Sequence, residues 1–201
     1  MKLEVSLDDG HSLDLKAAKL LEKYGIRGMF YIPINGELSN EEIRKIAKKH
    51  DIGGHTLTHA LLTRVDEDMA RFEITRGKEY LEDIIGKEIT SFCYPRGYYN
   101  EKVKQLVKEA GFKEGRTVKI FHINEGDDPY EKHTTIHVAQ SSQYNDDNWF
   151  DKAMEILRLK PKYLHIWGHS WEIERDNNWE KFEYLLKKAK ELQNESISRS
   201  R

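Results

Sequence analysis

The sequence predicts an α/β fold, a distorted (β/α)7-type barrel of mostly parallel strands in a single domain. The chain has 201 residues, which fits one domain and is long enough to bury a sizeable core. Short apolar runs alternate with longer segments of helical periodicity, and this alternation is typical of parallel α/β proteins. Seven strand-like runs in a chain of this length favour a barrel, or an incomplete barrel, over a large doubly wound sheet.

The predicted strands are short apolar runs bounded by turn-forming or charged residues. They are LEVSL (3–7), GMFYI (28–32), DIGG (51–54), TSFCY (90–94), TVKIF (117–121), TIHVA (135–139) and YLHIWG (163–168). Residues 122–134, between the fifth and sixth runs, show no clear period, so we expect a long loop there.

Six segments have helical periodicity, and several carry end signals. Ser39 and Glu42 form a capping box, Asn100 stands at an N-cap position, and Gly86 follows a predicted helix end. The predicted helices cover residues 13–24, 39–49, 66–85, 101–110, 147–159 and 178–193. We therefore expect the domain to span residues 1–193, followed by a polar, disordered tail at 194–201.

The composition restricts the class of protein. The formal net charge is only −2, which argues against a nucleic-acid-binding protein because such proteins usually carry a basic excess. A single cysteine, Cys93, excludes an internal disulfide and a multi-cysteine zinc site, whereas nine histidines leave imidazole ligands available. The first strand begins at once, without the apolar segment of a signal peptide, and no run is long enough to span a membrane. We therefore expect a cytoplasmic protein.

Polar and aromatic residues follow several of the predicted strands directly. In β/α barrels the active site lies at the carboxyl ends of the strands, so these residues should meet on one rim. They are Asp8 and Asp9 after the first strand, His55 and His59 after the third, PRGYY (95–99) after the fourth, and His169, Trp171 and Glu172 after the last.

His55 and His59 are four residues apart, a spacing that places both imidazoles on one face of a helical turn. Two such nitrogens and one carboxylate oxygen leave open coordination positions, as in catalytic zinc sites, and also suit Co²⁺, Ni²⁺ or Fe²⁺. The alternative is a helix start with two ordinary histidines. The two aspartates expected on the same rim favour the metal site.

Four segments resemble, in order, the motifs of polysaccharide deacetylases with the NodB-homology domain (carbohydrate esterase family 4). SLDDG (6–10) is similar to the family's T-F-D-D-G, and HTLTH (55–59) matches its H-[ST]-x-x-H in full. YPRGYYN (94–100) resembles the third motif, and LHIWGHSWE (164–172) stands where the last motif carries a histidine. The resemblance covers roughly residues 3–172 and implies a distorted (β/α) barrel.

The resemblance also implies an activity, the removal of N-acetyl groups from amino sugars in a glycan or glycoconjugate. It implies that Asp9, His55 and His59 hold the divalent metal, most simply Zn²⁺. Asp8 would then be the general base on a metal-activated water, and His169 the acid that protonates the leaving amine. A bound metal makes water more acidic, and a general base adds about 10²–10⁴ in rate.

Five residues are predicted to contact the substrate. The backbone N–H of Arg96 is the expected donor to the oxyanion, and Trp171 the expected stacking surface for a sugar, although tryptophans near strands more often belong to the core. DDNW (146–149) resembles the fourth motif of the family only weakly. The predicted substrate-binding residues are Pro95, Arg96, Tyr130, Trp171 and Glu172.

The third motif departs from the family pattern. An arginine that orients the catalytic aspartate usually precedes the prolines, and Cys93 stands at that position. Whether Arg96, Glu172 or nothing replaces it is open at the level of sequence, and Cys93 is expected to be a small core residue. Of the two histidines in the last motif, we expect His165 to be a core residue with satisfied hydrogen bonds.

Two alternatives remain open. One is a hydrolase of another C–N bond, such as a formamide or a cyclic amide. The other is a non-catalytic barrel that binds glycans. The complete set Asp8, Asp9, His55, His59 and His169 argues against a pure binding module, which has no need of a base and an acid.

Overall fold

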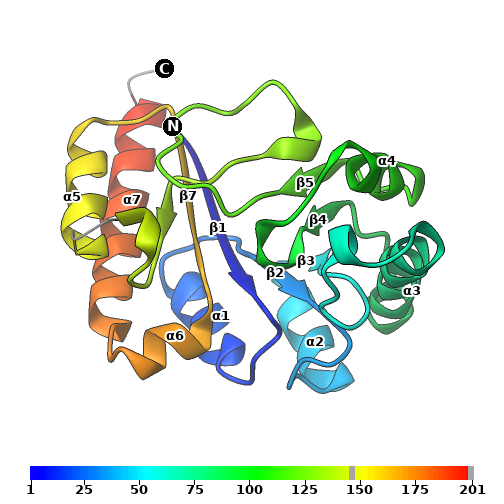
Figure 1. Cartoon of the computed structure of the whole chain (residues 1–201). Coiled ribbons are helices and arrows are strands. Elements are labelled where there is room, and N and C mark those ends of the chain that lie inside the picture. Colours follow the sequence, from blue (N-terminus) through cyan, green and yellow to red (C-terminus); the bar gives the residue numbers. More distant parts are fainter. Residues whose placement is uncertain (145–147, 199–201) are drawn as a thin grey trace.

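A computed structural model describes residues 1–144 and 148–198 and confirms the predicted single α/β domain. Every described strand pair is parallel, and the strand order is β5-β4-β3-β2-β1-β7-β6, a sheet curled into an incomplete barrel (Figure 1). The strands are β1 (Lys2–Asp8), β2 (Met29–Ile32), β3 (Asp51–Gly54), β4 (Ser91–Cys93), β5 (Glu114–Arg116), β6 (Ile136–His137) and β7 (Tyr163–Gly168).

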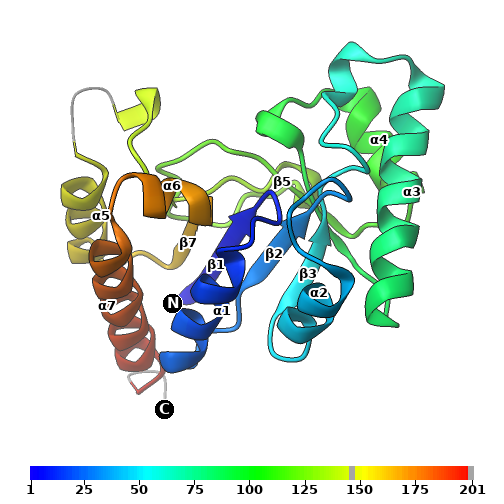
Figure 2. The ribbon, with the colours of Figure 1, turned by 90° about the horizontal axis from the view of Figure 1, so that it is seen from below.

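Helices cover the outside of the sheet, with α3 and α4 at one side and α5 and α7 at the other (Figure 2). The capping box is confirmed, since Ser39 and Glu42 exchange side-chain and backbone hydrogen bonds, and α3 ends at Gly86 with φ +68°. The helices are α1 (Asp14–Lys23), α2 (Asn40–Ala47), α3 (Glu67–Ile85), α4 (Glu101–Glu109), α5 (Trp149–Arg158), α6 (Ser170–Arg175) and α7 (Trp179–Ser198).

The end of the chain differs from the prediction. The helix α7 continues through Ser198, so residues 194–198, expected as a disordered tail, are helical, and residues 199–201 lie outside the described part of the chain. The short helix α6 was not predicted. No helix among residues 1–144 and 148–198 is long and apolar enough to cross a lipid bilayer. The cytoplasmic location stays a prediction.

The central strand β1 is buried on both faces. Val5 and Leu7 are 2% and 1% exposed and belong to the apolar core. Ser6 and Asp8 alternate with them and make polar contacts to the opposite side, Ser6 to His165 and Asp8 to Arg116. The barrel interior near the ends of the strands is therefore polar and contains titratable side chains.

The fifth strand is not where the sequence predicts it, and the expectation of a strand at 117–121 was wrong. The neighbouring strand β4 is followed by Pro95, which has no N–H, and by a 3₁₀ turn at residues 95–97. The ladder between β4 and β5 therefore ends at the pair Cys93–Arg116. This shift places Arg116 at the carboxyl end of a strand, on the rim of the barrel.

The segment after the long loop connects the two edges of the sheet. Lys132 bridges Arg116 beyond the end of β5, with the Thr117 N–H donating to the Lys132 carbonyl at 2.8 Å. Four residues later the same segment becomes β6, which pairs with β7 through Ile136 and Ile166. The gap between the edge strands is thus closed by a single irregular stretch of chain.

Candidate active site

Asp9, His55 and His59 converge at the carboxyl ends of β1 and β3. The Nε2 atoms of His55 and His59 lie 3.5 and 3.4 Å from Oδ1 of Asp9. All three ligand atoms lie within 4.8 Å of one another. The predicted convergence of these three residues is what the structure shows, while their role as metal ligands stays a proposal.

The donor set fits a divalent cation. In a tetrahedral site with bonds of about 2.1 Å, neighbouring ligand atoms are about 3.4 Å apart, close to the separations found here. Oδ1 of Asp9 is buried and has no hydrogen-bond partner among the described residues, although a buried carboxylate oxygen normally has one. The Nδ1–H of His55 donates to the Cys93 carbonyl at 2.8 Å, which leaves its Nε2 facing Asp9.

The charges of the metal-free group are strongly coupled. Burial alone would lower the pKa of His55, but contacts with Cys93 and Asp9 outweigh burial and raise it well above its usual value. Burial and the neighbouring His55 charge lower the pKa of His59. Burial opposes ionisation of Asp9 as well, yet the histidines hold its pKa far below the ordinary range. A bound cation would replace the proton on His55, so metal affinity should fall in acid.

The loop that carries the histidines is not the helical turn predicted from their spacing. Thr56 and His59 both adopt left-handed backbone conformations, each with φ +61°. Such a conformation costs of order 1–3 kcal/mol for a residue other than glycine and persists only where the surroundings hold it. The hydroxyl of Thr56 accepts a hydrogen bond from the Ala60 N–H at 3.0 Å and closes the turn.

Asp8 points into the barrel beside this group and is 2% exposed. The guanidinium of Arg116 donates to its carboxylate, and the Cys93 thiol lies 3.6 Å from its Oδ2. Burial opposes ionisation, but the Arg116 charge outweighs it and lowers the pKa of Asp8. The arginine that pairs with Asp8 is therefore Arg116, beside Cys93, while the carboxylate of Glu172 binds histidines instead.

Arg116 is itself fully enclosed. Its guanidinium carbon lies 5.0 Å from the ring centre of Tyr31 and 4.8 Å from that of Trp167, distances typical of cation–π contacts. Its Nη2 lies 2.9 Å from the sulfur of Cys93. The small thiol at position 93 therefore leaves room for a guanidinium that arrives from the neighbouring strand. The prediction of Cys93 as a small core residue agrees with its complete burial.

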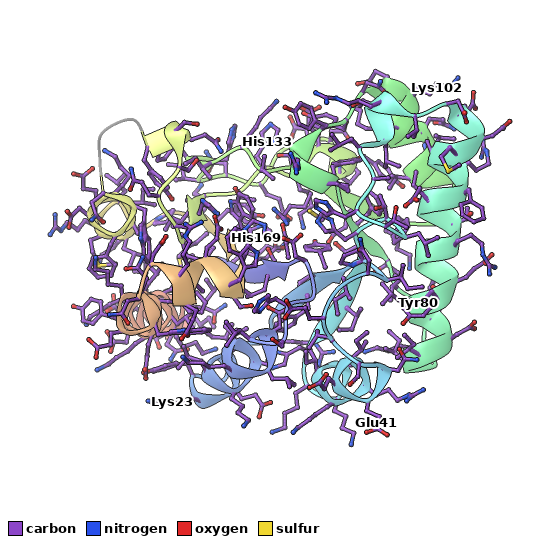
Figure 3. All side chains as sticks on the ribbon, turned by 60° about the horizontal axis from the view of Figure 1, so that its bottom comes forward. Lys23, Glu41, Tyr80, Lys102, His133 and His169 are labelled. Carbon is purple, nitrogen blue, oxygen red and sulfur yellow. The ribbon has the colours of Figure 1, made fainter. Side chains whose placement is uncertain are left out.

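His169 stands at the carboxyl end of β7, at the start of α6 (Figure 3). Its Nδ1–H donates to Oε2 of Glu172 at 2.6 Å, and its Nε2 lies 3.6 Å from Oδ2 of Asp9. The same oxygen of Glu172 accepts a hydrogen bond from Nε2 of His137 at 3.0 Å. Burial opposes a charge on His169, but Glu172 and the two aspartates raise its pKa above the usual value.

Glu172 differs in position from its prediction as a substrate contact. Its carboxylate faces the two histidines, and their hydrogen bonds outweigh burial and lower its pKa to about 2. His165, by contrast, lies deeper, bonded to Ser6 at 2.8 Å, and burial lowers its pKa to about 3. His165 is therefore a neutral core residue, as the sequence predicts.

The other predicted substrate contacts are divided between two places. Trp171 lies at the rim, with its indole N–H 3.4 Å from Oδ2 of Asp9. Arg96 is exposed with φ +54°, directly after the buried Pro95. Tyr130 is elsewhere, because its hydroxyl donates to the Phe112 carbonyl ahead of β5. The structure does not bring Tyr130 to the rim, and Asp146 and Asp147 of the DDNW segment lie outside the described residues.

Sequence reasoning missed Arg116 and His137. Arg116 was missed because the fifth strand was predicted at residues 117–121. In the structure Arg116 stands at the carboxyl end of β5, and Asp8 and His169 were predicted as site residues because they stand at the ends of their strands. His137 lies in the predicted sixth strand, where a histidine between apolar residues reads as core. Both are buried, and both contact a predicted catalytic residue or its partner.

The structure is thus a parallel α/β barrel with a carboxylate–histidine cluster, a buried aspartate and a histidine paired with a glutamate on one rim. The sequence pattern of the polysaccharide deacetylase family matches residues 2–115, more than half of the chain. The chain belongs to the polysaccharide deacetylase family. This confirms the resemblance drawn from the four motifs.

Relatives with known names agree with this membership. A peptidoglycan-N-acetylglucosamine deacetylase of Bacillus cereus is 27% identical over 114 residues, covering 55% of this chain and 53% of the relative. The chain thus spans about half the length of that curated protein. A polysaccharide deacetylase structure from Mycobacterium smegmatis covers 94% of this chain and 83% of its own, with a TM-score of 0.75 and 16% identity.

The likeness extends over the C-terminal part of the fold. A family 4 carbohydrate esterase from Streptomyces lividans, solved with acetate, covers 97% of this chain and 88% of its own. Its TM-score is 0.69 at 14% identity. Identities this low establish a shared fold, so the chemistry of this chain must be argued from its own residues.

Proposed function

We propose that the protein is a metal-dependent hydrolase that removes N-acetyl groups from amino sugars in a glycan or glycoconjugate. One observation carries the proposal: a buried Asp8 paired with Arg116, and His169 hydrogen-bonded to Glu172, stand beside the Asp9-His55-His59 group on one rim. The named deacetylase relatives support the choice of an acetamide over other C–N bonds.

Asp9, His55 and His59 would hold the cation, and Zn²⁺, Co²⁺, Ni²⁺ and Fe²⁺ all suit this donor set. When bound, the metal supplies Lewis-acid polarisation of the amide carbonyl and makes water easier to deprotonate. The protein contributes a fixed set of ligands, because the Cys93 carbonyl orients the His55 ring. A bound cation would also give Oδ1 of Asp9 the partner that it lacks among the described residues.

Asp8 is the proposed general base. Arg116 keeps it ionised and fixes its position, so it is ready to take a proton from the attacking water. The guanidinium does not compete for that proton, because arginine stays charged at any physiological pH. Asp8 is thus ionised in the resting protein despite full burial, a combination that an unpaired carboxylate does not sustain.

His169 is the proposed general acid for the leaving amine. Glu172 binds its Nδ1–H and leaves Nε2 directed towards the group around Asp9. The raised pKa favours the protonated form of His169, which an acid requires before the C–N bond breaks. We place the sugar against Trp171 and Arg96, the exposed or half-exposed residues that flank this group.

The test is acetate release from a panel of N-acetylated sugars and oligosaccharides, using chelator-stripped protein with and without Zn²⁺ or Co²⁺. We expect metal-dependent release that falls by about 10²–10⁴ in Asp8→Asn while the bound metal is retained. His169→Gln is a second variant, needed because Asp8→Asn leaves Arg116 without its partner.

The outcomes separate the alternatives. Release of formate or opening of a cyclic amide, in place of acetate release, would assign a different C–N substrate. Metal binding and glycan binding without turnover would indicate a non-catalytic barrel. Absence of bound metal would reject the assigned ligands.

A further inference from the structure

The loop that carries His55 and His59 rests on α3 through a buried carboxylate. Oε2 of Glu73 accepts a hydrogen bond from the Thr58 N–H at 2.8 Å, and Oε1 accepts one from the Thr58 hydroxyl at 2.7 Å. Glu73 is only 5% exposed, on a helix whose other acidic residues include exposed ones such as Glu79. Burying a carboxylate costs free energy unless its hydrogen bonds are made, and here both oxygens bind a single loop residue.

One helical turn further along the same face of α3, Gly77 presents no side chain to the loop. A Cβ at Gly77 would lie 2.8 Å from the Thr56 carbonyl carbon and 2.9 Å from the Leu57 nitrogen. Because those neighbours are backbone atoms, they cannot give way as a flexible side chain would. Gly77 therefore lets α3 touch the loop, and Glu73, four residues earlier, holds it.

The held segment lies between the two left-handed residues. Thr58 is flanked by Thr56 and His59, each with φ +61°. From the other side, the Leu57 carbonyl accepts from the Ile34 N–H at 2.7 Å, and the Thr58 carbonyl accepts from the Asn35 side chain at 3.2 Å. The conformation that brings both imidazoles to Asp9 is thus imposed by contacts from outside the loop.

We propose that Glu73 is a positioning residue of the metal site, which sets the backbone of residues 55–59 so that both imidazoles face Asp9. This inference rests on the proposed metal-binding function. Both hydrogen bonds that Glu73 makes among residues 1–144 and 148–198 go to Thr58, which is not one of the proposed ligands. Its effect passes through Thr58 and the strained backbone on both sides of it.

The test compares Glu73→Ala and Glu73→Gln by Zn²⁺ affinity, measured by competition with a chelating dye at a temperature where each variant is fully folded. Glutamine can accept from the Thr58 N–H and donate to its hydroxyl, so we expect its affinity to stay within about threefold of wild type. Alanine removes both bonds and should weaken binding by about 10–100-fold, as is typical for residues that orient ligands. Glu79→Ala, an exposed change on the same helix, is the matched control.

A purely structural role predicts another result. If Glu73→Ala lowers the melting temperature but leaves the Zn²⁺ affinity of the folded protein unchanged, the inference is wrong. The ¹⁵N chemical shifts of the His55 and His59 rings in metal-free protein give a second readout, which should move in Glu73→Ala and not in Glu79→Ala. Failure of the wild-type protein to bind Zn²⁺ would instead overturn the proposed function, and this assignment with it.

Discussion

The first 115 residues and the remainder of the chain contribute to the site in different ways. The first part supplies Asp8, Asp9, His55 and His59 in compact motifs that the family pattern covers. The second part supplies His169 and Glu172 from one short segment, together with Arg116 and His137, which reach their partners only in the folded chain. The comparison teaches that ligand spacing is local and visible in sequence, whereas the groups that tune the catalytic residues depend on strand register.

The largest expected effect comes from breaking the ion pair between Arg116, in the second part of the chain, and Asp8, in the first. Arg116→Met should destabilise the metal-free protein by about 3–5 kcal/mol, because it leaves the buried Asp8 without a partner. Urea unfolding measures the loss. The double variant Asp8→Asn with Arg116→Met should lose less than the sum of the single losses, since neither charge is then left unpaired. Additive losses would show that the pair is not coupled.

A second test concerns Asp14, which joins the two parts by accepting a 2.6 Å hydrogen bond from Ser170. Burial, together with the nearby Asp8 and Asp9, raises the pKa of Asp14 to about 8 from a model-peptide value of 3.8. The folded state then binds more protons than the unfolded state between these two pKa values, so Asp14 makes stability fall as pH rises through that window. Below and above it the contribution is flat.

Asp14→Asn should remove this pH dependence. Within the window, each pH unit lowers the free energy of unfolding of the wild-type protein by about 1.4 kcal/mol. Over the whole window the wild-type protein therefore loses roughly 5–6 kcal/mol of stability by pH 8. The amide oxygen can keep the Ser170 hydrogen bond, whereas an amide nitrogen left without a partner costs about 1–3 kcal/mol, so we expect a net gain of about 2–5 kcal/mol at pH 8. Thermal unfolding of metal-free protein at pH 5 and pH 8 provides the comparison. An equal difference between wild type and variant at both pH values would contradict the raised pKa.

A third test addresses the acid side of the site. Glu172→Gln should lower kcat about 10-fold, with KM and Zn²⁺ affinity unchanged, because the neutral amide no longer orients and stabilises protonated His169. Steady-state acetate release is the measurement, with Glu174→Gln on the exposed face of α6 as the control. A change in KM alone would return Glu172 to its predicted role as a substrate contact.

The smallest expected effect is at Cys93. Burial raises the pKa of its thiol, and the side chain is fully enclosed. We expect no reaction with a thiol reagent in the native protein within the time in which the unfolded protein reacts completely. Rapid labelling of native protein would mean that the barrel opens near Arg116.

Much of the fold was predictable because its signals are local. The capping box at Ser39 and the stop at Gly86 depend on a few neighbouring residues, and both were correctly placed. The fifth strand was not, since TVKIF has the composition of a strand while its position depends on where Pro95 ends the ladder of its neighbour. The error in that strand is the reason Arg116 was missed.

The site shows the same limit. The spacing of His55 and His59 predicted their convergence but not the left-handed backbone that produces it. Glu172 was recognised as a site residue beside His169, yet its second partner, His137, could not be read from the sequence because it is 35 residues away. Glu73 gave no signal at all, since a glutamate in a charged amphipathic helix normally faces solvent.

The position of β1 has a consequence for how the chain folds. Residues 2–7 pair on one side with residues 163–168, across almost the whole length of the chain. Parallel pairing at such separation is intrinsically slow, because a very long loop must close before any contact forms. During synthesis the proposed base and metal ligands therefore emerge long before the acid, and the edge of β1 stays open until β7 arrives. Assembly of a competent catalyst should coincide with that last strand insertion.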